Sequence, residues 1–253
     1  MGKPTVIRKM LRRARHQLRN IRKRLVFYSE FRKFKASSGG FNRLMPVRWR
    51  DRLPCLNDST KTTGFDRHYI YHTAWAARLL KKISPKFHVD ISSSLYFVGI
   101  VSTFIPIRFY DYRPAAIKLT DLTCDHADLH SLPFEDESID SLSCMHVLEH
   151  IGLGRYGDSL DPEGDCKAMR ELSRVISSGG NLLVVVPVGK PRVQFNGQRV
   201  YSYAQIVQQF DKFKLMEFSL IEQQGQNGLI TGATESDVAT QTNGCGCFWL
   251  QKK

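Results

Sequence analysis

The feature that most constrains the fold is residues 182–186, Leu-Leu-Val-Val-Val, a run without a polar side chain. A strand with one face in water alternates apolar and polar residues, whereas a strand buried on both faces reads as a continuous, β-branched run. We therefore expect residues 182–186 to form a central strand of a sheet that helices cover on both sides.

Helical and strand-like segments alternate upstream of this strand. Residues 69–80, 95–104 and 166–176 have helical patterns, and the short apolar runs 87–91, 107–111 and 139–144 are typical of buried strands. Asp161 can cap the third helix, Pro162 fits its first turn, and Ser-Ser-Gly-Gly at 177–180 can end it. The alternation predicts an α/β fold with a doubly wound, mostly parallel, seven-stranded sheet.

The last third of the chain has a different pattern. Residues 203–210 can form one more helix, whereas 213–221 and 247–250 are strand-like and the polar residues 223–244 connect them. Two strands joined without an intervening helix predict a C-terminal antiparallel hairpin. A Rossmann-like sheet that ends in such a hairpin resembles the sheet of class I methyltransferases.

Positive charge is concentrated at the N-terminus. Residues 1–36 hold 13 of the 37 Lys and Arg residues and one acid, Glu30, and so carry +12 of the net charge of +13. The near-neutral remainder excludes a protein that binds nucleic acid by charge over its whole surface. We expect a basic amphipathic arm at 1–36, a linker at 37–64 with a hinge at 37–40, and a methyltransferase-like domain at 65–253.

The partner of the arm has three interpretations. A basic amphipathic helix suits the surface of an anionic membrane, RNA phosphates satisfy the same charges, and the helix can also dock on its own domain or on a protein partner. No run approaches the roughly 18–20 apolar residues of a membrane span, which excludes an integral membrane protein. The apolar stripe of the expected helix comprises Ile7, Leu11, Ala14, Leu18, Ile21 and Leu25.

The cysteines and the arm together predict a location. Six scattered cysteines do not form a disulfide scaffold, so a reducing compartment is expected, and no apolar segment of a secretory signal follows the N-terminal charges. We therefore predict a cytoplasmic protein, peripheral to the inner face of a membrane.

Residues 122–189 carry a resemblance to small-molecule methyltransferases that use S-adenosylmethionine. It rests on Ala-Asp-Leu-His-Ser-Leu-Pro-Phe at 127–134, His-Val-Leu-Glu-His at 146–150, Glu-Leu-Ser-Arg-Val at 171–175 and Gly-Gly at 179–180. The resemblance implies that Asp128 contacts the adenine amine and that Asp111 binds the ribose hydroxyls. A carboxylate at the carboxyl end of a parallel strand faces the ligand crevice and can accept two hydrogen bonds from a diol.

A closer resemblance covers roughly residues 65–253. The segments 150–158, 161–165, 186–189, 193–196, 199–202 and 245–248 are similar to the methyltransferase-like family catalogued as domain of unknown function 268. That resemblance implies S-adenosylmethionine as cofactor and a role in polysaccharide biosynthesis. The predicted activity is O-methylation of a sugar or surface-glycan precursor; the alternatives are a non-catalytic interaction protein with this fold and an RNA methyltransferase guided by the arm.

One departure from the superfamily concerns the loop after the first strand. Methyltransferases have Gly-x-Gly-x-Gly there, because only glycine lets the backbone approach the cofactor closely. In this chain the loop reads Ser92-Ser93-Ser94, so it either takes another path around the cofactor or has lost it. The predicted cofactor-binding residues are Asp90, Ser92, Ser93, Asp111, Asp128, Leu129 and Met145.

Methyl transfer to a hydroxyl needs alignment of the acceptor and a base. The loop after residues 139–144 offers His146, Glu149 and His150, with His150 or Glu149 as the general base; capping of the loop is the alternative role. The candidate substrate-binding residues, which could instead order their loops, are Arg155, Tyr156, Asp158, Asn196 and Arg199.

The sequence predicts no metal site. His146 to His150 matches H-x-x-E-H, but that zinc-peptidase motif needs one long helix, and Gly152 and Gly154 leave too little helix here. Cys245 and Cys247 form a lone C-x-C pair, and the other cysteines lack ligand spacing, so two buried thiols are expected.

Overall fold

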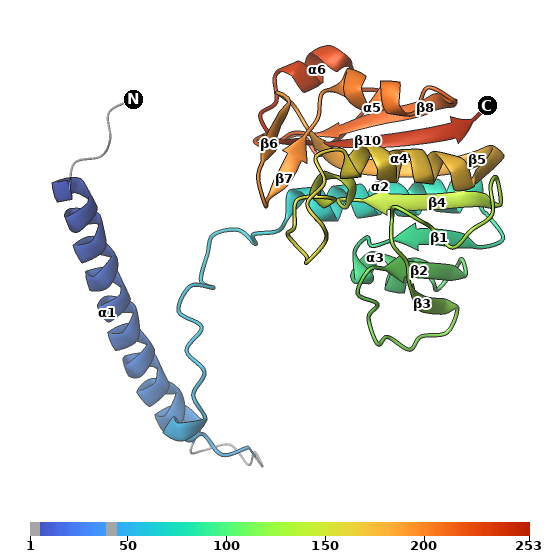
Figure 1. The fold of residues 1–253 in the computed structure, drawn as a ribbon. Helices are drawn as coiled ribbons and strands as arrows, with labels where there is room; N and C mark the ends of the chain where they lie inside the picture. The colour runs from blue at the N-terminus through green and yellow to red at the C-terminus, as the bar shows by residue number, and fades with distance from the viewer. Residues whose placement is uncertain (1–5, 39–44) are drawn as a thin grey trace. The chain divides into compact units, whose positions relative to one another are not determined.

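A computed structural model describes residues 6–38 and 45–253 and divides the chain into two compact units, residues 1–64 and 65–253 (Figure 1). The first unit contains helix α1 (Val6–Ser37) and the short 3-10 helix η2 (Trp49–Asp51). Trp49 packs against the aromatic end of α1, with ring centroids 4.9 Å from Phe31 and 5.3 Å from Tyr28. Residues 39 and 40 of the expected hinge lie outside the described residues.

Helix α1 carries the expected apolar stripe, and this stripe is exposed. Leu11, Leu18 and Leu25 keep 55%, 67% and 66% of their surface accessible in the described part of the chain. The side chain of Ile7 lies outside the described residues. Among the described residues, no helix combines the length and the apolar character that crossing a bilayer requires.

The second unit is built on one large sheet. Its eight described strands have the order β3-β2-β1-β4-β5-β10-β8-β9, and the first five are parallel. The C-terminal strand β10 pairs antiparallel with both β5 and β8. The strands are β1 (His88–Ile91), β2 (Ile107–Asp111), β3 (Leu122–His126), β4 (Ile139–Met145), β5 (Ile176–Val188), β8 (Phe213–Ile221), β9 (Leu229–Thr231) and β10 (Gly244–Lys252).

Helices cover both faces of this sheet, which explains the continuous apolar run in β5. On one face pack α2 (Arg67–Ile83) and α3 (Leu95–Val101); on the other pack α4 (Gly164–Val175) and α5 (Tyr203–Gln209) (Figure 1). Residues 182–186 alternate between the two cores and are fully buried. The remaining elements are η3 (Leu148–His150), the ribbon β6 (Arg192–Gln194) and β7 (Gln198–Val200), and α6 (Glu235–Ala239).

The doubly wound, mostly parallel architecture with a C-terminal antiparallel region is confirmed, but three local predictions are wrong. The sheet has an eighth strand, β9, inside the expected 223–244 connection. Residues 177–180 do not end a helix in a loop, because β5 begins at Ile176 and runs through them. Asp161 does not cap α4, because the N-cap position is Glu163. The Asp161 carboxylate accepts hydrogen bonds from the backbone N–H of Glu163 and from the side chain of Lys167.

Candidate functional site

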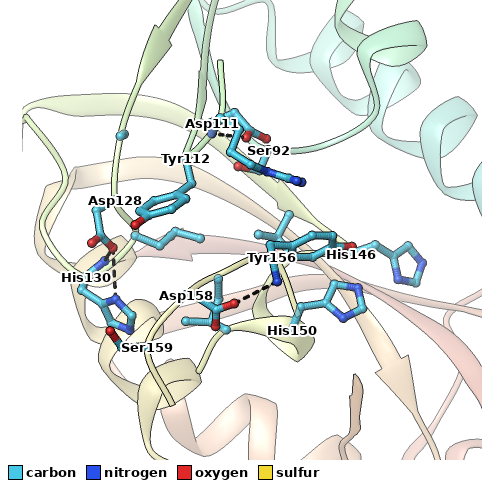
Figure 2. Close-up of a pocket in the computed structure, with 15 residues that line it drawn as sticks. Ser92, Asp111, Tyr112, Asp128, His130, His146, His150, Tyr156, Asp158 and Ser159 are labelled. Atoms are coloured by element: carbon cyan, nitrogen blue, oxygen red, sulfur yellow. Dashed lines mark hydrogen bonds and ion pairs between the residues drawn. The ribbon is translucent and has the colours of Figure 1, made fainter. Parts of the chain in front are cut away.

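A cavity of about 250 Å³ opens where β1, β2, β3 and β4 end, at their carboxyl ends (Figure 2). Ligands bind at this edge in open α/β sheets because successive strand ends and their loops surround a crevice there. The lining comprises Ser92, Asp111, Tyr112, Arg113, Ala127, Asp128, Leu129, His130, His146, Val147, His150, Ile151, Tyr156, Asp158 and Ser159.

Asp111 is the last residue of β2, and its side chain lines the cavity beside Ser92 (Figure 2). Its Oδ1 atom accepts a hydrogen bond of 2.7 Å from the backbone N–H of Arg113. Among the described residues, Oδ2 has no hydrogen-bond partner. The carboxylate is therefore held in place by one oxygen while the other remains able to accept from a ligand.

Asp128 follows β3, the neighbouring strand, and repeats this arrangement. Its Oδ1 atom accepts from the backbone N–H of His130 at 2.8 Å and lies 3.0 Å from His130 Nδ1. Its Oδ2 atom also has no partner among the described residues. Asp111 and Asp128 thus present one unpartnered carboxylate oxygen each to the same cavity.

The serine loop forms the base of the site in an unusual conformation. Ser92 has a φ of 55°, in the left-handed region that glycine occupies without steric cost. Its backbone N–H donates to Tyr110 O at 2.8 Å, and the backbone N–H of Ser93 donates to Asp90 Oδ1 at 3.1 Å. These two N–H groups are consequently occupied within the protein.

Three predicted cofactor-binding residues do not line the cavity but lie beneath it: Asp90, Ser93 and Met145. Asp90 is fully buried, and its Oδ2 accepts from the hydroxyl of Ser143. Burial raises the pKa of Asp90 to about 7, against the opposing effect of its hydrogen bonds from Ser143 and Ser93. The Ser93 hydroxyl accepts from Met145 N at 3.1 Å, so these residues join the ends of β1 and β4 and position Ser92 above them.

On the β4 side, His146 is held by two hydrogen-bonding groups. It has a φ of 58°, its Nδ1 lies 2.8 Å from Glu149 Oε1, and its Nε2 lies 3.4 Å from Cys245 Sγ. Glu149 is only 1% exposed and does not line the cavity. Because both ring nitrogens of His146 are engaged, neither is open to take a proton from an acceptor.

His150 is arranged differently. Its Nδ1 lies 2.7 Å from the carbonyl oxygen of Gly197, and only a protonated nitrogen can bond a carbonyl, so neutral His150 has its lone pair on Nε2. The Nε2 atom lies 3.8 Å from Glu149 Oε1. The Arg155 guanidinium approaches Nε2 more loosely, at 3.5 Å. Of the three predicted catalytic residues, His150 lines the cavity with its second ring nitrogen least tightly held.

The loop after η3 closes this side of the cavity. Asp158 accepts backbone hydrogen bonds from Gly152 at 2.8 Å, Gly154 at 3.2 Å and Tyr156 at 3.1 Å. Partial burial opposes ionisation, but these N–H donors prevail and lower the pKa of Asp158. Gly152 is required here, because a Cβ on it would approach Asp161 O to 2.1 Å.

Tyr156 spans the two sides of the cavity, as Figure 2 shows. The guanidinium carbon of Arg113 lies 4.8 Å from its ring centroid and that of Arg155 lies 5.0 Å away. Arg155 does not line the cavity itself; it also donates to the Gly197 carbonyl at 3.1 Å. Its guanidinium therefore fixes Tyr156 and the β6–β7 turn rather than facing a ligand directly.

Two predicted substrate-binding residues lie away from the cavity. Arg199 is 5% exposed, pairs with buried Asp165 at 3.4 Å and donates to the carbonyl of Ile151 at 2.6 Å. Asn196 has a φ of 59° in the β6–β7 turn, next to the Gly197 carbonyl that His150 bonds. Both residues support the loops of the site and do not line it.

The structure brings together eight of the predicted residues and adds others. Seven lining residues were not predicted: the apolar Ala127, Val147 and Ile151, and the polar Tyr112, Arg113, His130 and Ser159. Tyr112 and Arg113 directly follow the end of β2, and this position could have identified them as cavity residues from the sequence. The predicted residues on the cavity wall are Ser92, Asp111, Asp128, Leu129, His146, His150, Tyr156 and Asp158.

Comparisons with known proteins identify the fold. A family model described as "Caenorhabditis protein of unknown function, DUF268" matches residues 97–243. Among curated proteins, no relative matches the sequence.

The solved structures that are similar to the chain include the following two. A candidate sarcosine dimethylglycine methyltransferase from Galdieria sulphuraria is 10% identical with a TM-score of 0.50, and the match covers 73% of this chain and 86% of the other. The MccD protein is 12% identical with a TM-score of 0.50, over 71% of this chain and 96% of the other. At these identities the similarity shows the fold, a Rossmann-like fold shared with methyltransferases.

Proposed function

The chain belongs to the DUF268 family, and on this premise we propose that it is a methyltransferase that uses S-adenosylmethionine. One observation carries the proposal: Asp111 and Asp128, at the ends of neighbouring strands, each offer an unpartnered carboxylate oxygen to one cavity. Adenosine has hydrogen-bond donors at both of its ends, the ribose hydroxyls at one and the adenine amine at the other. Each end can therefore donate to one of the two carboxylates. Asp111 then accepts from the ribose hydroxyls and Asp128 from the adenine amine.

The methyl acceptor is a hydroxyl group of a sugar or glycan precursor in this proposal. S-adenosylmethionine, held by Asp111 and Asp128, would supply an electrophilic methyl group to the acceptor oxygen and would leave as S-adenosylhomocysteine. The acceptor proton passes to Nε2 of His150, which is the lone-pair nitrogen of its neutral ring. Tyr156 and the ordered Asp158 loop border the same space and supply polar contacts for a hydroxyl-rich ligand.

Isothermal titration calorimetry with S-adenosylhomocysteine tests the cofactor half of the proposal. We expect saturable binding, and a loss of about 10- to 100-fold in affinity for Asp111→Ala and for Asp128→Ala, because a hydrogen bond to a charged group contributes roughly 1.5–3 kcal/mol. Asp125→Asn is the matched control, since Asp125 is an exposed acid on β3 outside the cavity lining. Absence of binding at millimolar ligand would favour the non-catalytic interaction protein, an interpretation that the serine loop supports.

We also propose that helix α1 binds the cytoplasmic face of an anionic membrane. The support is the combination of dense positive charge with an exposed stripe that includes Leu11, Leu18 and Leu25. Phosphates of RNA would bind the charges and leave the leucines exposed, whereas an anionic lipid surface would bind the charges and bury the leucines. The tests are co-sedimentation with phosphatidylserine vesicles and an RNA-binding titration, each with the full chain and with residues 1–36 deleted. Leu18→Asp should abolish vesicle binding while preserving RNA binding if the stripe enters lipid; unaltered vesicle binding would contradict this.

A further inference from the structure

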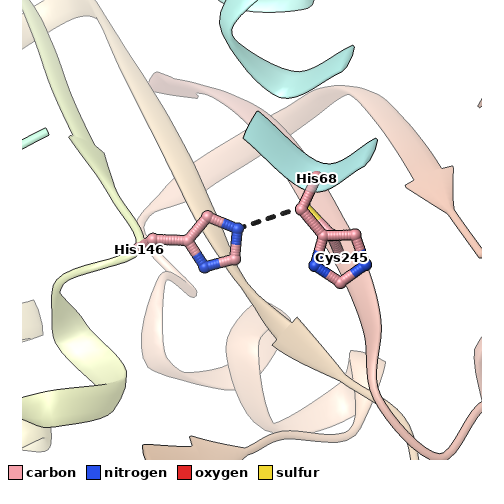
Figure 3. Close-up of side chains that lie close together, drawn as sticks. All are labelled: His68, His146 and Cys245. Atoms are coloured by element: carbon pink, nitrogen blue, oxygen red, sulfur yellow. Dashed lines mark hydrogen bonds between the residues drawn. The ribbon is translucent and has the colours of Figure 1, made fainter. Parts of the chain in front are cut away.

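Three side chains from distant parts of the chain converge next to the cavity (Figure 3). They are His68 in the first turn of α2, His146 directly after β4, and Cys245 in β10. One potential ligand atom from each lies within 4.8 Å of the other two. His146 Nε2 and Cys245 Sγ are 3.4 Å apart.

These separations are close to those of a metal centre. With zinc–nitrogen distances of about 2.0–2.1 Å and a zinc–sulfur distance of about 2.3 Å, tetrahedral ligand atoms lie roughly 3.3–3.6 Å apart. The His146–Cys245 pair already has this spacing. The ligand atom of the half-buried His68 lies within 4.8 Å of both and would move closer to them as the metal binds.

The surroundings of His146 also match those of a metal ligand. A ligating histidine ordinarily donates its second ring N–H to a carboxylate, which fixes the tautomer and leaves the other nitrogen for the metal. Here Glu149 Oε1 lies 2.8 Å from His146 Nδ1, and the Nε2 atom faces Cys245. Glu149 therefore has the position of the outer carboxylate in a carboxylate–histidine–zinc arrangement.

Unpartnered buried polar atoms beside the cluster are a second, independent observation. Within the described residues, His72 Nε2 and Glu149 Oε2 are buried and have no hydrogen-bond partner. The ring centroids of His72 and His146 lie 5.0 Å apart. The Nδ1 atom of His72 forms a hydrogen bond of 2.6 Å with the backbone carbonyl of His68. Buried groups of this kind are rare in folded proteins unless an ion or water satisfies them.

Metal binding at this cluster requires Cys245 to lose its thiol proton. The proton would leave for solvent as the thiolate forms, in exchange for the bond to the metal.

We propose that His68, His146 and Cys245 form a zinc-binding site. Two imidazoles and one thiolate bind zinc in preference to magnesium or calcium. Three protein ligands leave the fourth tetrahedral position for a solvent molecule. The site shares His146 with the H-x-x-E-H pattern but not His150, which bonds the Gly197 carbonyl instead. The inference does not depend on the proposed methyl transfer.

The function of this metal follows from its position. It would join the start of α2 to β4 and β10, and it would fix His146, which forms part of the cavity wall. Without the metal, His146 keeps its hydrogen bonds to Glu149 and Cys245 but is no longer tied to α2 through His68. We therefore expect ligand affinity at the cavity to depend on metal occupancy.

The test uses the full chain, stripped with a chelator and then incubated with zinc or cobalt alone. We expect one zinc per chain by mass spectrometry and, with cobalt, a thiolate-to-cobalt charge-transfer absorption band. Cys245→Ser should abolish that band, and His68→Ala should lower zinc affinity at least 10-fold. Neither measurement requires a methyl acceptor or S-adenosylmethionine.

Matched controls separate a specific site from a general effect of cysteine loss. Cys247→Ser alters the next buried thiol on the same strand, and Cys55→Ser alters an exposed one; both variants should keep the band and the stoichiometry. Should Cys245→Ser fail to fold, His68→Gln at the half-buried position provides the same test. Wild-type protein that retains no zinc, or full zinc affinity in both His68 variants, would overturn the proposal.

Discussion

On the β2–β3 side of the cavity, Asp111 and Asp128 are partly exposed, and each holds one oxygen with a backbone N–H and keeps the other without a partner. On the β4 side, His146 and Glu149 are nearly buried and are bonded to each other. The first side is built to accept hydrogen bonds from a ligand. The second side is built to hold its own groups in one arrangement, and in our proposal His150 is its one residue that faces the reacting atoms.

The largest effect should come from the one base on the β4 side. His150→Asn can keep the hydrogen bond to the Gly197 carbonyl but has no basic nitrogen. We expect methyl transfer to fall by about 10²- to 10⁴-fold, the usual contribution of a general base. Transfer of a labelled methyl group to sugar acceptors measures this, with calorimetry showing unchanged S-adenosylhomocysteine affinity. Full activity of the variant would remove His150 from the mechanism.

The next effect concerns the stability of the β4 side. Glu149→Ala leaves His146 without its buried carboxylate partner, and breaking a buried pair in this way typically costs about 3–5 kcal/mol. Chemical denaturation should show this loss for Glu149→Ala, whereas Asp111→Ala should change the free energy of unfolding by less than about 1 kcal/mol because Asp111 is not buried. Equal losses for the two variants would contradict the contrast between the sides.

Beneath the cavity, between β1 and β4, Asp90 gives a pH-dependent prediction. Burial raises its pKa from 3.8 to about 7, so the folded state keeps a proton that the unfolded state releases. Its contribution to stability is complete below pH 3.8 and is lost as the pH rises toward 7. Relative to Asp90→Asn, the wild-type melting temperature should therefore fall across this range. A difference that stays constant between pH 4 and pH 8 would show that Asp90 is not protonated in the folded protein.

The smallest effect is expected at the serine loop. Ser92 has a left-handed φ of 55°, which costs a residue with a Cβ roughly 1–2 kcal/mol. Ser92→Gly should relieve part of this strain, raise the melting temperature by a few degrees, and tighten S-adenosylhomocysteine binding because no Cβ narrows the base of the cavity. Ser94→Gly, at an ordinary φ of −68°, is the control and should destabilise slightly.

Much of the fold could be predicted from sequence because burial on two faces leaves a clear pattern. The run 182–186 in β5 and the apolar strands before it had that pattern. By contrast, β3 has one buried residue, Leu122, and β9 has none. The pattern of apolar and polar residues in these strands therefore does not differ from that of a loop. Their pairing depends on neighbouring strands, which the local sequence does not record.

The site was predictable where it follows strand ends and not where it depends on tertiary contacts. Asp111 and Asp128 could be placed because a carboxylate at the end of a parallel strand faces the crevice. Arg199 and Asn196 occur in a similar loop context, but one is buried with Asp165 and the other shapes a turn. The group of His68, His146 and Cys245 joins three separate segments, and no spacing rule connects residues that far apart in the chain.

A crystal structure of the protein with S-adenosylhomocysteine tests the central claim most directly. The account predicts the ribose hydroxyls within hydrogen-bond distance of the free Asp111 oxygen and the adenine amine at that of Asp128, above an unchanged Ser92. A ligand bound elsewhere, or a nucleoside in the cavity that touches neither carboxylate, would contradict it.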